Sequence, residues 1–228
     1  MRRASNTLAR VAAASLALAL WPLAGFATLE DAGWQTLSLP DRAPARFALR
    51  SDGVIEVETK ASVGFLYRDV EQAGGRLVWR WRVDKGGPAS DLMQRGEDDR
   101  PLAVHLWFPE QETSFKDLLA GFFGYPRFGR AITYVWAADG SKGKRFANPY
   151  LDPGQGMIIV LRDRSDDLGA WHSETVDYAA DYRRHFGTAP PPPKFVAISG
   201  DSDDLGGMTL GWVAGLQFQE KPQSERLH

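Results

Sequence analysis

The stretch Val78–Val83 reads VWRWRV and alternates bulky apolar side chains with cations. In an extended strand, successive side chains point to opposite faces, so Trp79 and Trp81 share one face while Arg80 and Arg82 share the other. Indoles favour a buried face, whereas arginine is rarely buried without a partner. The pattern therefore predicts a half-buried strand of an antiparallel sheet, with its arginines on the outer side.

Short runs of β-branched and aromatic residues, separated by Gly, Pro and Asp, extend this pattern along the chain. No sustained helical periodicity lies between them, which favours an all-β antiparallel sandwich of the jelly-roll type over an alternating α/β fold. The expected strands lie at 46–49, 54–59, 62–67, 77–83, 102–108, 132–137, 157–162, 170–176, 195–199 and 211–219.

One or two short helices are expected beside the strands. Residues 115–123 (FKDLLAGFF) are apolar enough to pack as a helix or lid. Residues 177–186 (DYAADYRRHF) carry acids early and Arg and His late, which suits a helix dipole, and Gly187 ends the helix.

The N-terminal residues have the pattern of a secretory signal peptide. Arg2 and Arg3 precede the apolar run Val11–Leu20, and small residues up to Ala27 supply a cleavage site. The run is short for a membrane span, so no stable membrane insertion is expected after cleavage; an uncleaved anchor helix is the alternative. The expected organisation is a signal peptide over 1–27, one sandwich domain over 28–220 and a polar tail over 221–228, in a periplasmic or secreted bacterial protein.

Composition narrows the class of protein. The 228 residues include no Cys, which excludes disulfides, a thiol nucleophile and a thiolate metal site. The net charge is −2, and it becomes −5 without residues 1–27, which contain three Arg and no acid. A mildly acidic chain without a dense basic tract is a poor partner for nucleic acid or an anionic membrane, so both classes are excluded.

Arginine and aromatic side chains form the first candidate site. The polar face of 78–83 and the His/Trp face of 102–108 line one surface if these strands are neighbours. Guanidinium groups make bidentate bonds and flat rings stack on sugar faces, so such a surface suits a glycan or small polar ligand. The alternative is that the arginines pair with acids and the aromatic rings pack in the core. The predicted ligand-binding residues are Arg80, Arg82, His105, Trp107 and Glu174.

Two acidic loops, 97–99 and 201–204, form the second candidate site. Oxygen-rich loops bind Ca²⁺, although neither loop has the twelve-residue spacing of an EF-hand. The alternatives are ion pairs from these loops to Arg80 or Arg82, or simple solvation. We expect pairing with acids for Arg80 and leave Arg82 open. The predicted metal ligands are Asp98, Asp99, Asp201 and Asp203.

The sequence contains none of the common catalytic motifs. There is no Gly-x-Ser-x-Gly elbow, no His-Glu-x-x-His, no phosphate-binding glycine loop and no Glu-x-Asp-x-Glu strand motif of laminarinase-like hydrolases. Non-catalytic binding of a polar ligand is therefore the leading hypothesis. The alternatives are a polysaccharide hydrolase or lyase that uses Glu174 or Asp98 with His105, and a structural envelope protein with a partner surface at 115–123.

Several segments together resemble an uncharacterised bacterial family, domain of unknown function 3047. They cover most of the chain after residue 27: WRWRV (79–83), GEDD (96–99), YVW (134–136), NPY (148–150), WHSE (171–174), DYRRHFG (181–187) and DSD (201–203). The resemblance implies an exported β-sandwich and no established activity.

The chain departs from the family pattern at two places. The family has Arg-Asn where Val176-Asp177 stand here, and Asn-Thr where Asp204-Leu205 stand. If those positions bind a ligand in relatives, binding is altered in this member.

Overall fold

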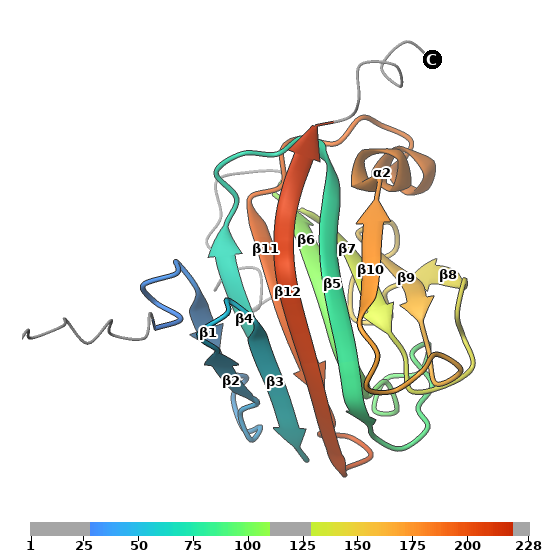
Figure 1. Cartoon of the computed structure of the whole chain (residues 1–228). Coiled ribbons are helices and arrows are strands. Elements are labelled where there is room, and N and C mark those ends of the chain that lie inside the picture. Colours follow the sequence, from blue (N-terminus) through green and yellow to red (C-terminus); the bar gives the residue numbers. More distant parts are fainter. Residues whose placement is uncertain (1–27, 110–128, 221–228) are drawn as a thin grey trace, which may run out of the picture.

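The computed structural model describes residues 28–109 and 129–220, whose strands form two sheets packed face to face (Figure 1). Sheet A has the order β1-β4-β11-β6-β7-β9-β8, and sheet B has the order β10-β5-β12-β3-β2. Sheet A consists of β1 (Gln35–Leu37), β4 (Val63–Asp69), β6 (Arg100–Phe108), β7 (Arg130–Trp136), β8 (Arg145–Ala147), β9 (Gly156–Arg162) and β11 (Phe195–Asp201). Sheet B consists of β2 (Arg46–Leu49), β3 (Ile55–Lys60), β5 (Gly75–Gly86), β10 (His172–Val176) and β12 (Met208–Glu220).

The predicted antiparallel sandwich is confirmed, with one exception. The neighbours β7 and β9 run parallel, while the other paired strands are antiparallel. Two strands, β1 and β8, have no counterpart among the ten predicted. Each has three residues at a sheet edge, too few for a two-residue period to be visible.

The core lies between the two sheets and depends on the VWRWRV stretch of β5. Trp79 is 3 % exposed and Trp81 is fully buried. Their rings lie 5.7 Å from those of Tyr134 and Trp136 of β7, respectively, measured between centroids. Burial of one such indole contributes roughly 4–6 kcal/mol before entropy is counted. The predicted period of two is therefore what places the tryptophans inside.

The sheets approach closely enough that some core positions have room only for glycine. At Gly211 of β12, an added Cβ would lie 2.5–2.8 Å from side-chain carbons of Leu102 on β6. At Gly200 of β11, it would lie 2.8 Å from Val57 and 2.9 Å from Thr59. These glycines allow the strands of sheet A and sheet B to pack tightly.

The one helix described, α2 (Tyr178–Phe186), matches the prediction for 177–186. The carboxylate of Asp177 accepts a hydrogen bond from the Ala180 N–H, which caps the first turn. Gly187 has φ 75°, a left-handed conformation that glycine adopts without strain, and its N–H donates to the Arg183 carbonyl.

The predicted signal peptide (1–27), helix (115–123) and tail (221–228) lie outside the described residues, so these predictions and the domain boundaries stay predictions. In the described ranges, no helix is long and apolar enough to cross a membrane.

Candidate functional site

Pairing of β6 with β11 brings the two acidic loops together. β6 begins at Arg100 and β11 ends at Asp201, and the register places these two residues opposite one another. Because neighbouring antiparallel strands start and end at the same edge, the loop before Arg100 meets the loop after Asp201.

A cavity of about 100 Å³ lies at this edge, and we name it the charged pocket. Its volume holds several waters but is below the roughly 300 Å³ of pockets that enclose a drug-sized ligand. It therefore fits the polar end of a ligand rather than a whole molecule. Its lining combines apolar with charged and hydroxyl groups: Leu39, Val63, Phe65, Arg42, Asp98, Arg100, Tyr150, Asp201, Asp203 and Asp204.

Arg100 is the central cation of the pocket. Its Nη1 lies 2.9 Å from a carboxylate oxygen of Asp98 and 3.2 Å from one of Asp201. The hydroxyl of Tyr150 donates to the other oxygen of Asp98. Burial alone would lower the pKa of Arg100, but the charges of Asp201 and Asp98 raise it above its ordinary value. Arg100 is therefore a permanent cation held between two buried carboxylates.

Burial changes the proton affinity of the acids around this cation. It raises the pKa of Asp201 well above its usual range; the Arg100 charge opposes this, and the neighbouring Asp203 adds to it. Burial also raises the pKa of the Tyr150 phenol, and its bond to Asp98 raises it further. Asp201 therefore retains a proton to a higher pH than an exposed aspartate does.

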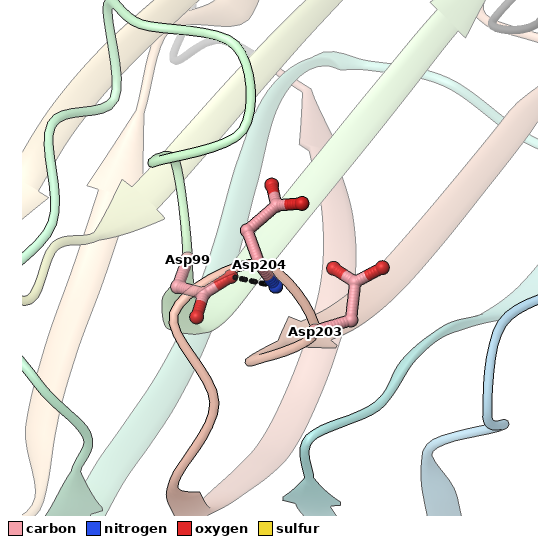
Figure 2. Close-up of side chains that lie close together, drawn as sticks. All are labelled: Asp99, Asp203 and Asp204. Carbon is pink, nitrogen blue, oxygen red and sulfur yellow. Dashed lines mark hydrogen bonds between the residues drawn. The ribbon is translucent and has the colours of Figure 1, made fainter.

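The second group of acids is fixed by the backbone of the loop after β11. Figure 2 shows the Asp99 carboxylate turned toward the backbone nitrogen of Asp204, from which it accepts a bond of 3.2 Å; its other oxygen accepts one of 2.9 Å from Leu205 N–H. Burial raises the pKa of Asp99, and these two bonds oppose that shift. On the other side, Nη1 of Arg42 lies 2.7 Å from Asp203 and 3.5 Å from Asp204.

The structure redistributes the predicted calcium ligands. Asp99, Asp203 and Asp204 each have a carboxylate oxygen within 4.8 Å of the others and could hold a metal ion. Asp98 and Asp201, also predicted, contact Arg100 instead. Calcium takes six to eight oxygens, and these three carboxylates already bind backbone N–H groups or Arg42. The described residues therefore do not form a complete calcium site.

The predicted surface that combines the arginines with His105 and Trp107 does not exist. β5 and β6 belong to different sheets, so Arg80 and Arg82 lie on the outer face of sheet B and His105 and Trp107 on the outer face of sheet A. The prediction that Arg80 pairs with the acidic loops is wrong, and Arg82, which was left open, contacts Asp84 instead. The acids of those loops contact other arginines: Asp98 contacts Arg100, and Asp203 contacts Arg42.

Trp107 is buried, and His105 is partly buried with both ring nitrogens bonded to protein hydroxyls. Trp107 is 4 % exposed and packs in a cluster with Phe65. The ring nitrogens of His105 lie 3.1 Å from the Thr133 hydroxyl and 2.8 Å from the Ser199 hydroxyl. Burial, with a smaller effect of the Arg100 charge, lowers the pKa of His105 to about 3. His105 is therefore a neutral residue with both nitrogens occupied.

The two arginines of β5 stack with tryptophans on the outer face of sheet B. The Arg82 guanidinium lies 5.0 Å from the Trp212 ring and 5.3 Å from the Trp171 ring, and its Nε is 3.0 Å from Asp84. The Arg80 guanidinium lies 5.0 Å from Trp171 and, within 28–109 and 129–220, forms no ion pair. With Arg50, 5.8 Å from Trp212, these side chains form a line across the sheet. We name it the arginine–tryptophan row: Arg50, Trp212, Arg82, Trp171 and Arg80.

Glu174 lies at a third place, the edge of the sandwich between β9 and β10. It accepts hydrogen bonds of 3.0 Å from Trp81 Nε1 and 2.7 Å from Arg162 Nε. Neither Glu174 nor Asp98 contacts His105, whose nitrogens bond to the Thr133 and Ser199 hydroxyls. The acid–base pairs considered for hydrolysis are not assembled.

Sequence reasoning missed three polar residues of the charged pocket, Arg42, Arg100 and Tyr150, as well as its apolar wall. Arg100 was visible as the cation directly after an acidic loop, at the start of a predicted strand. Tyr150 belongs to the NPY segment, but nothing in the sequence places that segment beside residues 96–98, where Tyr150 accepts a bond from the Gly96 N–H. Arg42 has no local signal, since its partners follow it by more than 150 positions.

Fold and site together define an antiparallel β-sandwich with a charged pocket at one edge of a sheet. The chain belongs to the family described as "Protein of unknown function (DUF3047)", whose model matches residues 32–217. The predicted family is thereby confirmed. Three of the segments that carry the resemblance, 96–99, 148–150 and 201–203, meet at the charged pocket.

A search of curated proteins finds no match. Among solved structures, the chain is similar to the xyloglucanase domain of NopAA, a type three effector from Sinorhizobium fredii in complex with cellobiose (9% identity, 83% of this chain and 95% of that one, TM-score 0.45). It is also similar to the K2 cleaved adhesin domain of Lys-gingipain (14% identity, 85% of this chain and 96% of that one, TM-score 0.38). A third similar structure is the family 11 xylanase from Neocallimastix patriciarum (13% identity, 81% of this chain and 98% of that one, TM-score 0.35). Likenesses at this level carry no inference about function.

Proposed function

We propose that this protein is an exported, non-catalytic β-sandwich that binds a carbohydrate or a similar polar ligand at the charged pocket. The observation that carries this proposal is the combination of fixed charges with an apolar wall in one cavity. Sugars present hydroxyl groups beside apolar ring faces. Carboxylates accept from hydroxyls, a guanidinium donates to them, and apolar side chains pack on the ring.

The polar groups of the pocket are held in place before any ligand arrives. Asp98 is fixed by Arg100 and Tyr150, and the loop that carries Asp203 and Asp204 is fixed by the carboxylate of Asp99. Such groups lose little conformational freedom when a ligand binds, which favours affinity. The small volume suits a terminal sugar or the polar end of a longer molecule.

The signal-peptide pattern of residues 1–27 supports export to the periplasm or the outside of the cell, where glycans are available. The environments of His105 and Glu174 support a non-catalytic role. The first is a neutral imidazole with both nitrogens occupied, and the second bonds to Trp81 and Arg162.

Glycan-array screening followed by calorimetry tests the proposal. Hydrogen bonds to charged groups contribute about 1.5–3 kcal/mol, so we expect Asp203→Asn and Arg42→Ala each to weaken binding by about 10- to 100-fold. The matched control is Arg80→Ala, a cation on the opposite sheet, which should leave affinity unchanged.

Three results would contradict the proposal in different ways. Loss of binding in Arg82→Ala or Trp171→Ala, with the pocket variants unaffected, would place the site on the arginine–tryptophan row. Release of products from a bound polysaccharide would favour the hydrolase or lyase alternative. Absence of binding to every glycan and polar ligand tested would overturn the proposal itself.

A further inference from the structure

A second cavity, of about 590 Å³, lies far from the charged pocket in the fold and shares no residue with it. It is a groove between the end of β4, the connection from β4 to β5, and the C-terminal part of β12. Its volume is within the roughly 300–1,000 Å³ of small-molecule sites. The charged, amide and aromatic residues of its lining are Arg68, Asp69, Glu71, Gln72, Gln217 and Phe218.

The groove exists because β12 extends beyond the end of its pairing with β3. β12 pairs with β3 only as far as Val213, whereas it pairs with β5 as far as Glu220. The register with β5 shifts between Ala214 and Gln217, and Gly215 has a left-handed φ of 63°. Beyond this bulge, one edge of β12 has no strand partner among the described residues, and the groove runs along it.

Arg68 is a partly buried cation that makes no ion pair with a carboxylate among the described residues, although Asp69 and Glu71 line the same groove. Its guanidinium carbon lies 4.7 Å from the Trp34 ring centroid, and its Nη2 donates a bond of 3.1 Å to the Leu216 carbonyl. Within the described residues, this is its one hydrogen bond and it has no ion pair. Burial lowers the pKa of Arg68, and the charge of Glu71 partly opposes that effect.

Other arginines of the chain that are partly shielded from water show what Arg68 lacks. Arg82, Arg100 and Arg162 each contact at least one carboxylate at 2.7–3.2 Å. A guanidinium has five N–H groups in a planar fork that matches a carboxylate. Most of the fork of Arg68 is therefore available to a ligand.

We propose that this groove binds a small carboxylic acid bearing hydroxyl groups, of the sugar-acid class, with its carboxylate on Arg68. The amides of Gln72 and Gln217 supply donors and acceptors for hydroxyls, and the Phe218 ring supplies an apolar surface. Asp69 and Glu71 line the same groove and add two negative charges. Those charges repel a multivalent anion such as phosphate more strongly than a ligand with a single carboxylate.

Calorimetric titration of the full chain with glucuronate, glucose and inorganic phosphate, at matched ionic strength, tests the proposal. We expect glucuronate to bind at least 10-fold more tightly than glucose or phosphate. Arg68→Gln, which retains a donor for the Leu216 carbonyl, should bind glucuronate at least 10-fold more weakly than the unmodified chain. Arg68→Lys should weaken glucuronate binding less. Gln72 is exposed, so Gln72→Ala should weaken glucuronate binding about 3-fold without loss of stability. This variant tests the groove even if Arg68→Gln fails to fold.

Arg42→Ala separates this site from the charged pocket. It should leave glucuronate affinity unchanged, whatever it does to neutral glycans. Loss of glucuronate binding in Arg42→Ala but not in the Arg68 and Gln72 variants would assign the acid to the charged pocket and overturn the proposal. Equal affinity for glucose and glucuronate, or no binding of glucuronate, would overturn it as well.

Discussion

Asp201 and Arg100 face each other across the β11–β6 ladder, and a carboxylate oxygen of Asp201 lies 3.2 Å from Nη1 of Arg100. The same nitrogen lies 2.9 Å from Asp98. A buried ion pair adds little net stability, but removal of one partner is costly because the other charge remains buried and uncompensated. One guanidinium therefore joins Asp98, in the loop just before β6, to Asp201, at the end of β11.

Arg100→Leu should accordingly destabilise the protein by about 3–5 kcal/mol. Urea unfolding at pH 7 measures the change. The matched control is Arg42→Ala, whose side chain is 46% exposed and which should change stability by about 1 kcal/mol or less. Equal effects of the two substitutions would contradict the central role assigned to Arg100.

Asp204→Asn should stabilise the fold at neutral pH by about 0.5 kcal/mol, the order of one charge interaction near a surface. Burial and the charges of Asp203, Asp98 and Asp99 raise the pKa of Asp204. The folded chain therefore holds this proton more tightly than the unfolded chain does, so ionisation of Asp204 costs stability above its folded pKa. The gain in the variant should vanish below about pH 3.9, where Asp204 is protonated in both states. Thermal unfolding of both proteins from pH 3 to pH 8 measures the difference in stability. A stabilisation by Asp204→Asn that grows as the pH falls would contradict a raised pKa of Asp204.

His105 should make the protein less stable in acid. Its pKa is about 3 in the folded chain, against 6.5 ordinarily, so the unfolded chain takes up this proton first as the pH falls. Above about pH 6.5, His105 is neutral in both states and does not lower the free energy of unfolding. Between about pH 6.5 and pH 3, the free energy of unfolding falls with a limiting slope of about 1.4 kcal/mol per pH unit. His105→Gln should flatten the dependence of the free energy of unfolding on pH in this window. An imidazole of His105 that titrates near pH 6.5 by NMR would show the prediction to be wrong.

The arginine–tryptophan row should stabilise sheet B through stacking. A double-mutant cycle of Arg82→Ala and Trp212→Ala should give a coupling free energy of about 0.5–1 kcal/mol, as expected for a cation over an indole near the surface. The cycle of Arg80→Ala with Trp212→Ala is the control, because Arg80 stacks on Trp171 instead. Coupling of equal size in both cycles would mean that the effect is not one of direct contact.

Gly211→Ala should destabilise the sandwich by about 1–3 kcal/mol, because its Cβ would overlap the Leu102 side chain on the opposing sheet. Gly86→Ala is the control: it lies in β5, and no atom approaches the position of its Cβ within 4 Å. Chemical denaturation compares the two variants. Similar midpoints would show that the sheets can separate locally without cost.

The sequence predicted strands well where side chains alternate. The alternation from Val78 to Val83 predicts both the buried face and the outer face of the strand. The helix at 177–186 was predicted from the acids near its start and from Gly187 at its end. The parallel pairing of β7 with β9 was not predicted, because strand order depends on contacts between distant segments that leave no local pattern.

The site was harder to predict than the fold for the same physical reason. Acids in two loops were recognisable as a group, but the only ion-pair partners considered for them were Arg80 and Arg82 of β5, the most conspicuous cations in the sequence. The period of two shows that Arg80 and Arg82 face outward and says nothing about which sheet they belong to. The predicted surface required β5 and β6 to be neighbours in one sheet, and because they belong to different sheets, His105 and Trp107 lie apart from Arg80 and Arg82.

The position of β12 at the centre of sheet B has a consequence for how the molecule forms. Its strand neighbours, β3 and β5, end at Lys60 and Gly86, whereas β12 begins at Met208. Until residues 208–220 pair with both strands, β3 and β5 are not part of one sheet, and their inner faces remain exposed to solvent. Folding must therefore wait for a closure over more than 120 residues, which makes it slow and leaves the chain extended for longer.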